Sequence, residues 1–162
     1  AIAVMNGPGS YTGLRVGLAA AKGICYALKI PLICIHTIDW IAYGNQSDNT
    51  DLVCPMIDAR RMEVFTGLYS REMNRVLEPS ALVLDEQSFS AQLAEKRIHF
   101  VGNGAPKWKD ICHHPHAVFP EAVHDAGHFA QMSLLAYQQE KFADLAYAEP
   151  FYTKEFFNTQ KK

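Results

Sequence analysis

A glycine-rich turn between an apolar strand and a long apolar helix constrains this chain more than any other feature. Residues 1–5, AIAVM, are typical of a buried strand; NGPGS follows, and the spacing predicts a helix over residues 12–28. Pro31 breaks that helix, and PLICI at residues 31–35 predicts a second buried strand. Two such strands joined by a helix imply a parallel pair with a right-handed crossover.

The turn itself could hold a phosphate, because backbone amides at a helix N-terminus bind anions. It is not a Walker loop, since Leu14 and Arg15 stand where that loop requires Lys and Ser or Thr. It is not the dinucleotide pattern either, because Thr12 replaces the third glycine. A tight turn without a ligand is the alternative. The candidate residues are Gly7, Gly9, Ser10, Thr12 and Gly13.

The helix after the turn carries only two charges, Arg15 and Lys22, and its apolar side chains point in every direction around the axis. A helix that is apolar on all sides is buried on all sides, so we expect one side to cover the sheet and the other to meet a second lobe or chain. A central core helix within one domain is the alternative. The predicted interface residues are Leu14, Gly17, Leu18, Ala21, Ile24 and Cys25, with Gly13, Gly17 and Ala21 as a stripe of small residues.

The pattern changes in the rest of the chain. Thr37 is a plausible N-cap for a short helix over residues 37–44, and the polar residues 45–51 predict a loop between two lobes, 1–44 and 52–162. Asp85 or Ser88 could cap a later helix. We expect strands at 52–58, 62–70, 74–84 and 98–101, helices at 86–96, 106–112 and 121–142, irregular structure at 113–120 and a C-terminal tail from residue 148.

Three short segments could carry chemistry. HDAGH has the spacing of a zinc-protease helix, with Asp125 in place of Glu, but it lacks a third ligand; His124 and His128 are then helical histidines facing solvent. HHPH at 113–116 is a surface loop or a weak metal site.

The third segment, IDARRMEV, places Asp58, Arg60, Arg61 and Glu63 around a hairpin turn, where arginines could meet a phosphate or a partner's carboxylate. Solvated turn charges are the alternative. Arg15 is a further candidate for a contact with a partner or an anion.

Composition narrows the function classes. The net charge of −2 does not favour autonomous binding to nucleic acid. No cysteines pair as CxxC, so we expect reduced thiols in a cytoplasmic protein at Cys25, Cys34, Cys54 and Cys112. No apolar run reaches the length of a membrane span. Because the chain opens inside an apolar strand and without Met, we expect it to be a fragment.

Four motifs, in order along the chain, resemble the TsaB (YeaZ) family. NGPGSYTGLRVGLAAAKGICYAL is similar to the family's GPGSFTGLRIG signature and IDARRMEVF to its DARR-x-EV segment. FVGNGA is similar to a V-G-D-G-A turn, and EPFYTKEF to a C-terminal P-x-Y segment. Tyr11, Asn103 and Thr153-Lys154 depart from the family's usual Phe, Asp and Leu-Arg.

The resemblance implies an actin-like ATPase (ribonuclease-H-like) α/β fold of two lobes, with the first strands and first helix missing here. It implies a role in threonylcarbamoyl modification of tRNA adenosine next to the anticodon, as the non-catalytic partner of the catalytic paralogue TsaD. The ATPase TsaE joins the two, ATP is used by the complex, and tRNA is reached through it. The isolated family protein homodimerises through helices of the first lobe, including the one after the glycine turn.

Two hypotheses follow. The first is a scaffold that activates a catalytic partner and needs no cofactor or metal of its own, with the glycine turn as the remnant of a phosphate site. The second is an active enzyme of the same fold, either ATP-using or metallopeptidase-like (the family was once labelled glycoprotease, peptidase M22).

Overall fold

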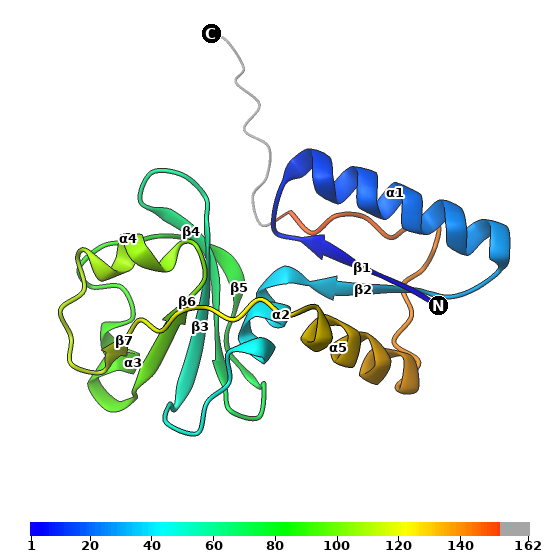
Figure 1. The fold of residues 1–162 in the computed structure, drawn as a ribbon. Helices are drawn as coiled ribbons and strands as arrows, with labels where there is room; N and C mark the ends of the chain where they lie inside the picture. The colour runs from blue at the N-terminus through cyan, green and yellow to red at the C-terminus, as the bar shows by residue number, and fades with distance from the viewer. Residues whose placement is uncertain (153–162) are drawn as a thin grey trace, which may run out of the picture.

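The structure is a computed structural model and describes residues 1–152 of the 162-residue chain. It opens with a parallel pair of strands, β1 (Ile2–Gly7) and β2 (Leu32–His36), joined by the helix α1 (Tyr11–Leu28). A short helix, α2 (Thr37–Gly44), continues directly from β2. The predicted strand–helix–strand–helix order is therefore confirmed, and Figure 1 shows α1 lying along the two-stranded sheet.

Local chemistry sets both ends of α1. The Ser10 side chain accepts a hydrogen bond from the amide of Gly13 at 3.2 Å, which caps the first turn. At the other end Lys29 adopts a left-handed conformation, with φ of 53°, and its amide bonds the carbonyl of Cys25. Thr37 does not cap α2, because the N-cap position falls on His36, whose side chain makes no capping bond.

A five-stranded mixed sheet forms the second half of the fold. Its order is β5-β4-β3-β6-β7, with antiparallel pairs β3–β4 and β4–β5 and parallel pairs β3–β6 and β6–β7. The strands are β3 (Leu52–Asp58), β4 (Glu63–Ser70), β5 (Arg75–Val83), β6 (Ile98–Val101) and β7 (Ala117–Val118). The helices α3 (Ser90–Glu95) and α4 (Ala105–Lys109) follow β5 and β6.

Alternation along β3 divides the core between the two faces of this sheet. Cys54 and Met56 pack with Phe100 and Trp108, in the cluster that α3 and α4 cover. Val53 packs on the opposite face with the apolar side of α2. Because both faces are covered, β3 is buried at every position from Leu52 to Met56.

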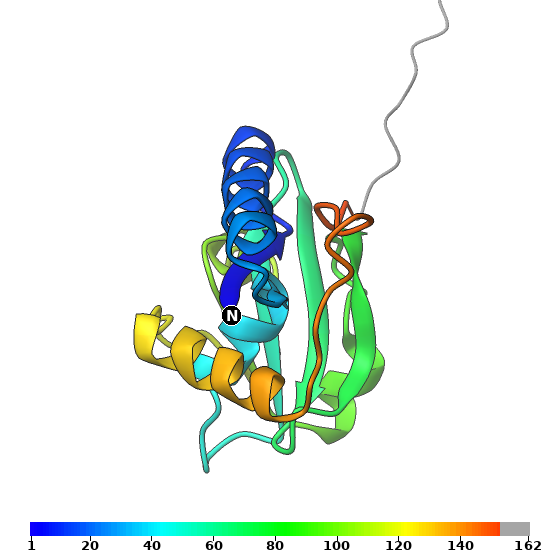
Figure 2. The ribbon, with the colours of Figure 1, turned by 90° about the vertical axis from the view of Figure 1, so that its right-hand side faces the viewer.

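The chain then returns to its first strands through α5 (Ala126–Gln138). In Figure 2, α1 and α5 lie on one side of the molecule, and β4 and β5 lie on the other. After α5, the amide of Ala143 donates to the carbonyl of Leu32 at 2.8 Å, and Leu145 and Ala148 join the core under α1. Residues 143–152 therefore pack with the first lobe, although the predicted division assigns them to the second.

Three elements differ from the sequence-based expectation. The helix predicted from residue 86 begins only at Ser90, because Asp85 and Ser88 bond each other in a turn and Phe89 is left-handed. The segment predicted as irregular contains the two-residue strand β7. The helix predicted over 121–142 is shorter, since Asp125 is its N-cap. The predicted tail continues past residue 152, outside the described residues.

All four cysteines are free in the structure, with Cys25 and Cys54 buried and Cys34 and Cys112 half-buried. Burial raises the pKa of the Cys54 thiol to about 12. Within residues 1–152, no helix is both long and apolar enough to cross a membrane.

One ion-paired network connects α2 to the large sheet. The hydroxyl of Tyr69, on β4, donates to Asp39 Oδ1 on α2 at 2.6 Å, and Arg75 Nη2 on β5 donates to Asp39 Oδ2 at 2.7 Å. Burial and the Asp39 carboxylate raise the pKa of Tyr69 far above its usual value, so the phenol remains a donor.

We therefore predict that Tyr69→Phe lowers the free energy of unfolding by about 1.5–3 kcal/mol, because it removes a buried hydrogen bond to a charged acceptor. Urea denaturation followed by circular dichroism measures this. Tyr26→Phe is the control, since Tyr26 is 80% exposed and its loss of a hydroxyl should change little. Equal midpoints for the two variants would show that the network does not stabilise the fold.

Candidate interaction surface

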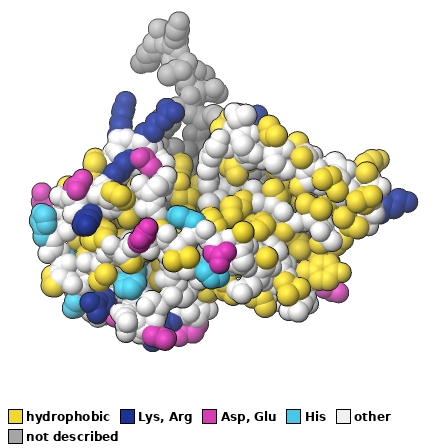
Figure 3. Space-filling view, viewed as in Figure 1, with side chains coloured by type: hydrophobic (Ala, Val, Ile, Leu, Met, Phe, Trp, Pro, Cys, Tyr) yellow, Lys and Arg dark blue, Asp and Glu magenta, His cyan; other side chains and the backbone are white. Residues whose placement is uncertain are grey.

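The outer face of α1 is exposed, apolar and uncharged. It consists of eight residues: Val16, Ala19, Ala20, Gly23, Ile24, Tyr26, Ala27 and Leu28. Val16 and Leu28 are both 64% exposed, and Tyr26 is 80% exposed. Hydrophobic side chains gather over α1 in the space-filling view (Figure 3). An exposed apolar face of this kind is a candidate surface for binding another protein.

The two charged side chains within α1 both serve contacts inside the chain. Lys22 Nζ donates to the carbonyls of Ala146 and Ala148 at 3.2 and 3.0 Å. Arg15 Nε donates to the Tyr152 hydroxyl at 2.8 Å, and its guanidinium lies 4.1 Å from the centre of the Tyr11 ring. The bond to Tyr152 raises the pKa of Arg15. Both charges therefore have partners within the chain, although Arg15 itself is exposed.

Gly23 has no role inside the described chain. A Cβ added at this position would meet no atom within 4 Å. A glycine in a helix interior makes the helix less stable than an alanine would, by about 0.5–1 kcal/mol. The presence of glycine at position 23 therefore needs an explanation from outside the described chain. Close approach of a second helix is such an explanation, because Ala19, Ala20 and Ala27 beside it are also small.

The predicted interface residues fall mostly on the inner side of α1. Leu18, Ala21 and Cys25 are buried against the chain's own strands, and a Cβ on Gly17 would contact Val4 at 3.8 Å. Leu14 is half-buried, and only Ile24 is exposed. In the predicted stripe of small residues, Gly13 is exposed, Gly17 is half-buried and Ala21 is buried. The side of α1 that faces the strands is set by Leu18, Ala21 and Cys25, with Leu14 half-buried beside them.

The glycine turn is closed by the C-terminal segment. Gly7 has φ of 113°, and a Cβ there would lie 2.9 Å from the carbonyl oxygen of Phe151. The amide of Phe151 donates to the carbonyl of Asn6 at 2.7 Å, and the Phe151 ring packs edge-on against His36. The predicted phosphate residues Gly9, Ser10, Thr12 and Gly13 remain exposed or nearly so, but the Ser10 hydroxyl is used as the helix cap.

A second glycine turn follows β6 and is explained by packing. Gly102 has φ of 101°, and a Cβ there would come within 2.4 Å of the carbonyl oxygen of Met56. A Cβ on Gly104 would meet Val64 at 2.9 Å. Both glycines allow the turn to approach β3, and the Asn103 side chain accepts a hydrogen bond from the amide of Asp58 at 2.9 Å.

The structure brings together the predicted hairpin residues Asp58, Arg60 and Arg61 between β3 and β4. Asp58 Oδ1 accepts hydrogen bonds from Lys107 Nζ at 2.5 Å and from the amide of Arg60 at 2.6 Å. The bond from Lys107 holds the pKa of Asp58 below its usual value. Arg15 is not part of this group, since its partners are Tyr11 and Tyr152.

The histidine motifs do not form a metal centre. The expectation of solvent-facing helical histidines is met by neither residue: His124 is exposed but precedes α5 and packs against Trp40, whereas His128 lies within α5 and is half-buried against Tyr43. His116 Nδ1 lies 2.8 Å from the carbonyl of Leu93. In residues 1–152, no three His, Cys, Asp or Glu side chains are placed to share a metal ion.

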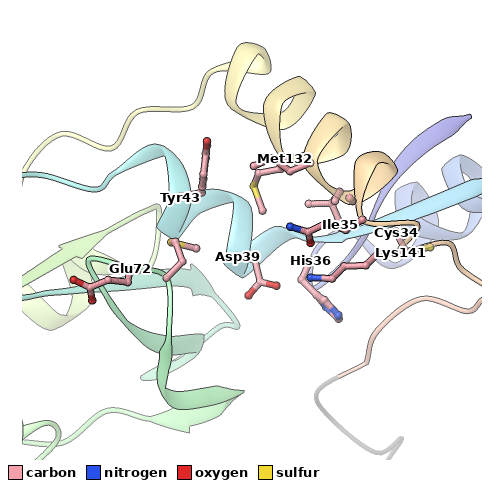
Figure 4. A pocket seen from close by; sticks show the side chains of 12 residues that line it. Cys34, Ile35, His36, Asp39, Tyr43, Glu72, Met132 and Lys141 are labelled. Carbon is pink, nitrogen blue, oxygen red and sulfur yellow. The ribbon is translucent and has the colours of Figure 1, made fainter.

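A pocket that the sequence did not predict lies between β2, α2 and α5 (Figure 4). Its volume is about 550 Å³, and its polar lining includes His36, Asp39 and Lys141. Burial lowers the pKa of His36. Sequence patterns could not reveal this pocket, because most of its lining comes from two distant parts of the chain, residues 34–43 and 132–141. Within the pocket, Asp39 is already bonded to Tyr69 and Arg75.

Comparison with known proteins identifies the family. Residues 1–152 match the family described as TsaD, tRNA N6-adenosine threonylcarbamoyltransferase. The chain is 42% identical over 77 residues to a tRNA threonylcarbamoyladenosine biosynthesis protein TsaB from Bacillus subtilis, covering 48% of this chain and 33% of that protein. It is 31% identical over 116 residues to the TsaB of Escherichia coli, covering 68% of this chain and 50% of that protein. The chain thus spans a third to a half of the length of these relatives.

Solved structures support the fold. A Pseudomonas aeruginosa protein with similarity to the peptidase YeaZ superimposes with a TM-score of 0.77 at 21% identity, over 94% of this chain and 73% of that one. A second structure, YeaZ from the same organism, gives a TM-score of 0.66 over 93% and 73%. The predicted actin-like α/β fold and the predicted resemblance are both confirmed. The chain therefore belongs to the tRNA N6-adenosine threonylcarbamoyltransferase (TsaD) family and, within it, to the TsaB (YeaZ) branch.

Proposed function

We propose that this chain acts in the biosynthesis of threonylcarbamoyladenosine in tRNA as a non-catalytic subunit that binds a catalytic TsaD-type paralogue. The pathway comes from its relatives, which are named for it. A TsaD-type transferase from Clostridium perfringens is itself 44% identical over 57 residues, so such a paralogue shares local sequence with this chain. The observation that carries the proposal is the uncharged, exposed outer face of α1.

The outer face suits a helix-to-helix contact. Its small residues allow close approach, while Val16, Ile24, Tyr26 and Leu28 supply apolar area around them. A paralogue with the same fold presents an equivalent helix, so one surface serves both a homodimer when the protein is alone and a heterodimer with the paralogue. A TsaE-type ATPase joins this pair, tRNA is bound through the complex, and the protein is cytoplasmic.

In this proposal the chain needs no cofactor of its own, and ATP is used by the complex. The packing of both glycine turns supports that view, since Phe151 lies over the first turn and β3 lies against the second. The alternative of an active ATP-using or metallopeptidase-like enzyme has no specific observation in its favour within residues 1–152.

We predict that Val16→Glu combined with Tyr26→Glu weakens binding to the paralogue at least 10-fold, because two charges enter the apolar contact. Size-exclusion chromatography with light scattering on the full-length protein, alone and mixed, measures this. Both side chains are exposed, so folding is preserved, whereas Leu18→Glu would place a charge in the chain's own core. Leu134→Glu, at a 56% exposed position on α5, is the matched control. Undiminished complex formation by the double variant would contradict the proposal.

A second prediction separates partner binding from stability. Gly23→Ala should raise the free energy of unfolding of the isolated protein by about 0.5–1 kcal/mol and at the same time weaken the complex, because the new methyl group points outward. Gly17→Ala is the matched control on the inner side of the same helix, where the methyl group meets Val4 at an ordinary contact distance. It should stabilise the protein without changing affinity. Thermal unfolding and titration calorimetry measure both effects, and equal affinities for the two variants would count against the outer face.

A further inference from the structure

The connection between β3 and β4 adopts a backbone that does not suit its residues. Arg60 and Arg61 have φ of 72° and 48°, so two successive arginines are left-handed. The amide of Glu63 bonds the carbonyl of Arg60 at 3.1 Å, and the amide of Ala59 bonds the carbonyl of Glu63 at 3.0 Å, which closes the turn. Hairpin turns of this kind favour Gly, Asn or Asp, because other residues are strained there. The arginines therefore lower the stability of the turn that they occupy.

Hydrogen bonds through Asp58 hold this strained hairpin turn, the tip of the hairpin, in place. The Asp58 carboxylate binds the Arg60 amide and Lys107 Nζ, and the Asp58 amide is bound by Asn103. The hairpin is thereby fixed to the turn before α4. Asp58 forms its ion pair with Lys107, and its charge acts on Arg60 without an ion pair between them.

The guanidinium groups of Arg60 and Arg61 are available to a ligand. Both residues are exposed, and in the part of the chain that the structure describes neither guanidinium forms an ion pair. Lys109 on α4 is exposed as well. Figure 3 shows Lys and Arg side chains projecting at this end of the molecule, at the upper left. Backbone strain retained at exposed side chains is typical of binding sites rather than of structural turns.

We propose that Arg60 and Arg61 at the β3–β4 hairpin bind the phosphodiester backbone of an RNA. Planar guanidinium groups bind phosphate oxygens in pairs, and a braced turn holds them without further ordering. No exposed aromatic side chain lies at the tip among the described residues, as the centre of a protein interface usually has. The proposal rests on the proposed function, because tRNA is the substrate of that pathway.

Filter binding of a tRNA transcript to the complex of full-length protein and paralogue, over a series of salt concentrations, tests this. For Arg60→Gln with Arg61→Gln we expect a loss of affinity of about 5- to 20-fold at low salt. The slope of log affinity against log salt should fall by about 1.4–1.8, as two lost phosphate contacts require. Lys96→Gln with Arg97→Gln is the matched control, since it removes two exposed charges at the opposite end of β6. The control should leave affinity nearly unchanged.

A second variant keeps the test independent of folding. Arg60→Gly with Arg61→Gly relieves the strain, so the melting temperature should rise by about 2–4 °C while tRNA affinity falls as in the glutamine variant. Unchanged affinity in both variants, or an equal loss in the Lys96 and Arg97 control, overturns the proposal. A loss of paralogue binding with tRNA affinity retained also overturns it and makes the tip a protein contact. Failure of the wild-type proteins to form a complex would count against the proposed function alone, and tRNA binding is then measured on the single protein.

Discussion

The packing of α1 on its two-stranded sheet is the constraint on which the rest of the structure depends. Leu18, Ala21 and Cys25 fix which side of the helix faces β1 and β2. Once that side is set, Lys22 and Arg15 reach the returning C-terminal segment, and the remaining residues form an outer face without charge. The same packing thus brings the C-terminal segment over Gly7 and leaves the apolar outer face that we propose for a partner.

The two glycine turns resemble phosphate-binding turns, but their glycines make room for the chain's own backbone. The β3–β4 hairpin differs from them in its exposed arginines. In both turns the glycines allow close approach of the chain's own backbone, from Phe151 to Gly7 and from Gly102 to Met56. A ligand at Gly7 would have to displace the C-terminal segment. At the hairpin, in contrast, the strained arginines leave their cationic groups in solvent, which suits a macromolecular anion better than a small buried ligand.

Much of the fold could be predicted from the sequence. In β1, α1, β2 and α2 and in the hairpin, the spacing of the apolar residues agrees with the positions of the residues that end helices and strands. The failures have local causes: Phe89 takes a left-handed conformation before α3, and Asp125 caps α5 inside a continuous apolar pattern. Most of the interface residues predicted on α1 are buried within the chain, since a uniformly apolar helix has no polar face from which its orientation could be predicted. The contacts of residues 143–152 depend on distant strands, which no sequence period reveals.

Hydroxyl-radical footprinting of the full-length protein, free and in complex with its TsaD-type paralogue, tests the central claim most directly. Tyr26 and Leu28 are highly exposed on α1, while Tyr137 on α5 is 49% exposed and provides an internal reference. The account predicts that oxidation of Tyr26 and Leu28 falls several-fold in the complex and that oxidation of Tyr137 is unchanged. Equal oxidation of Tyr26 in the free and bound protein would contradict the assignment of the outer face of α1 as the partner surface.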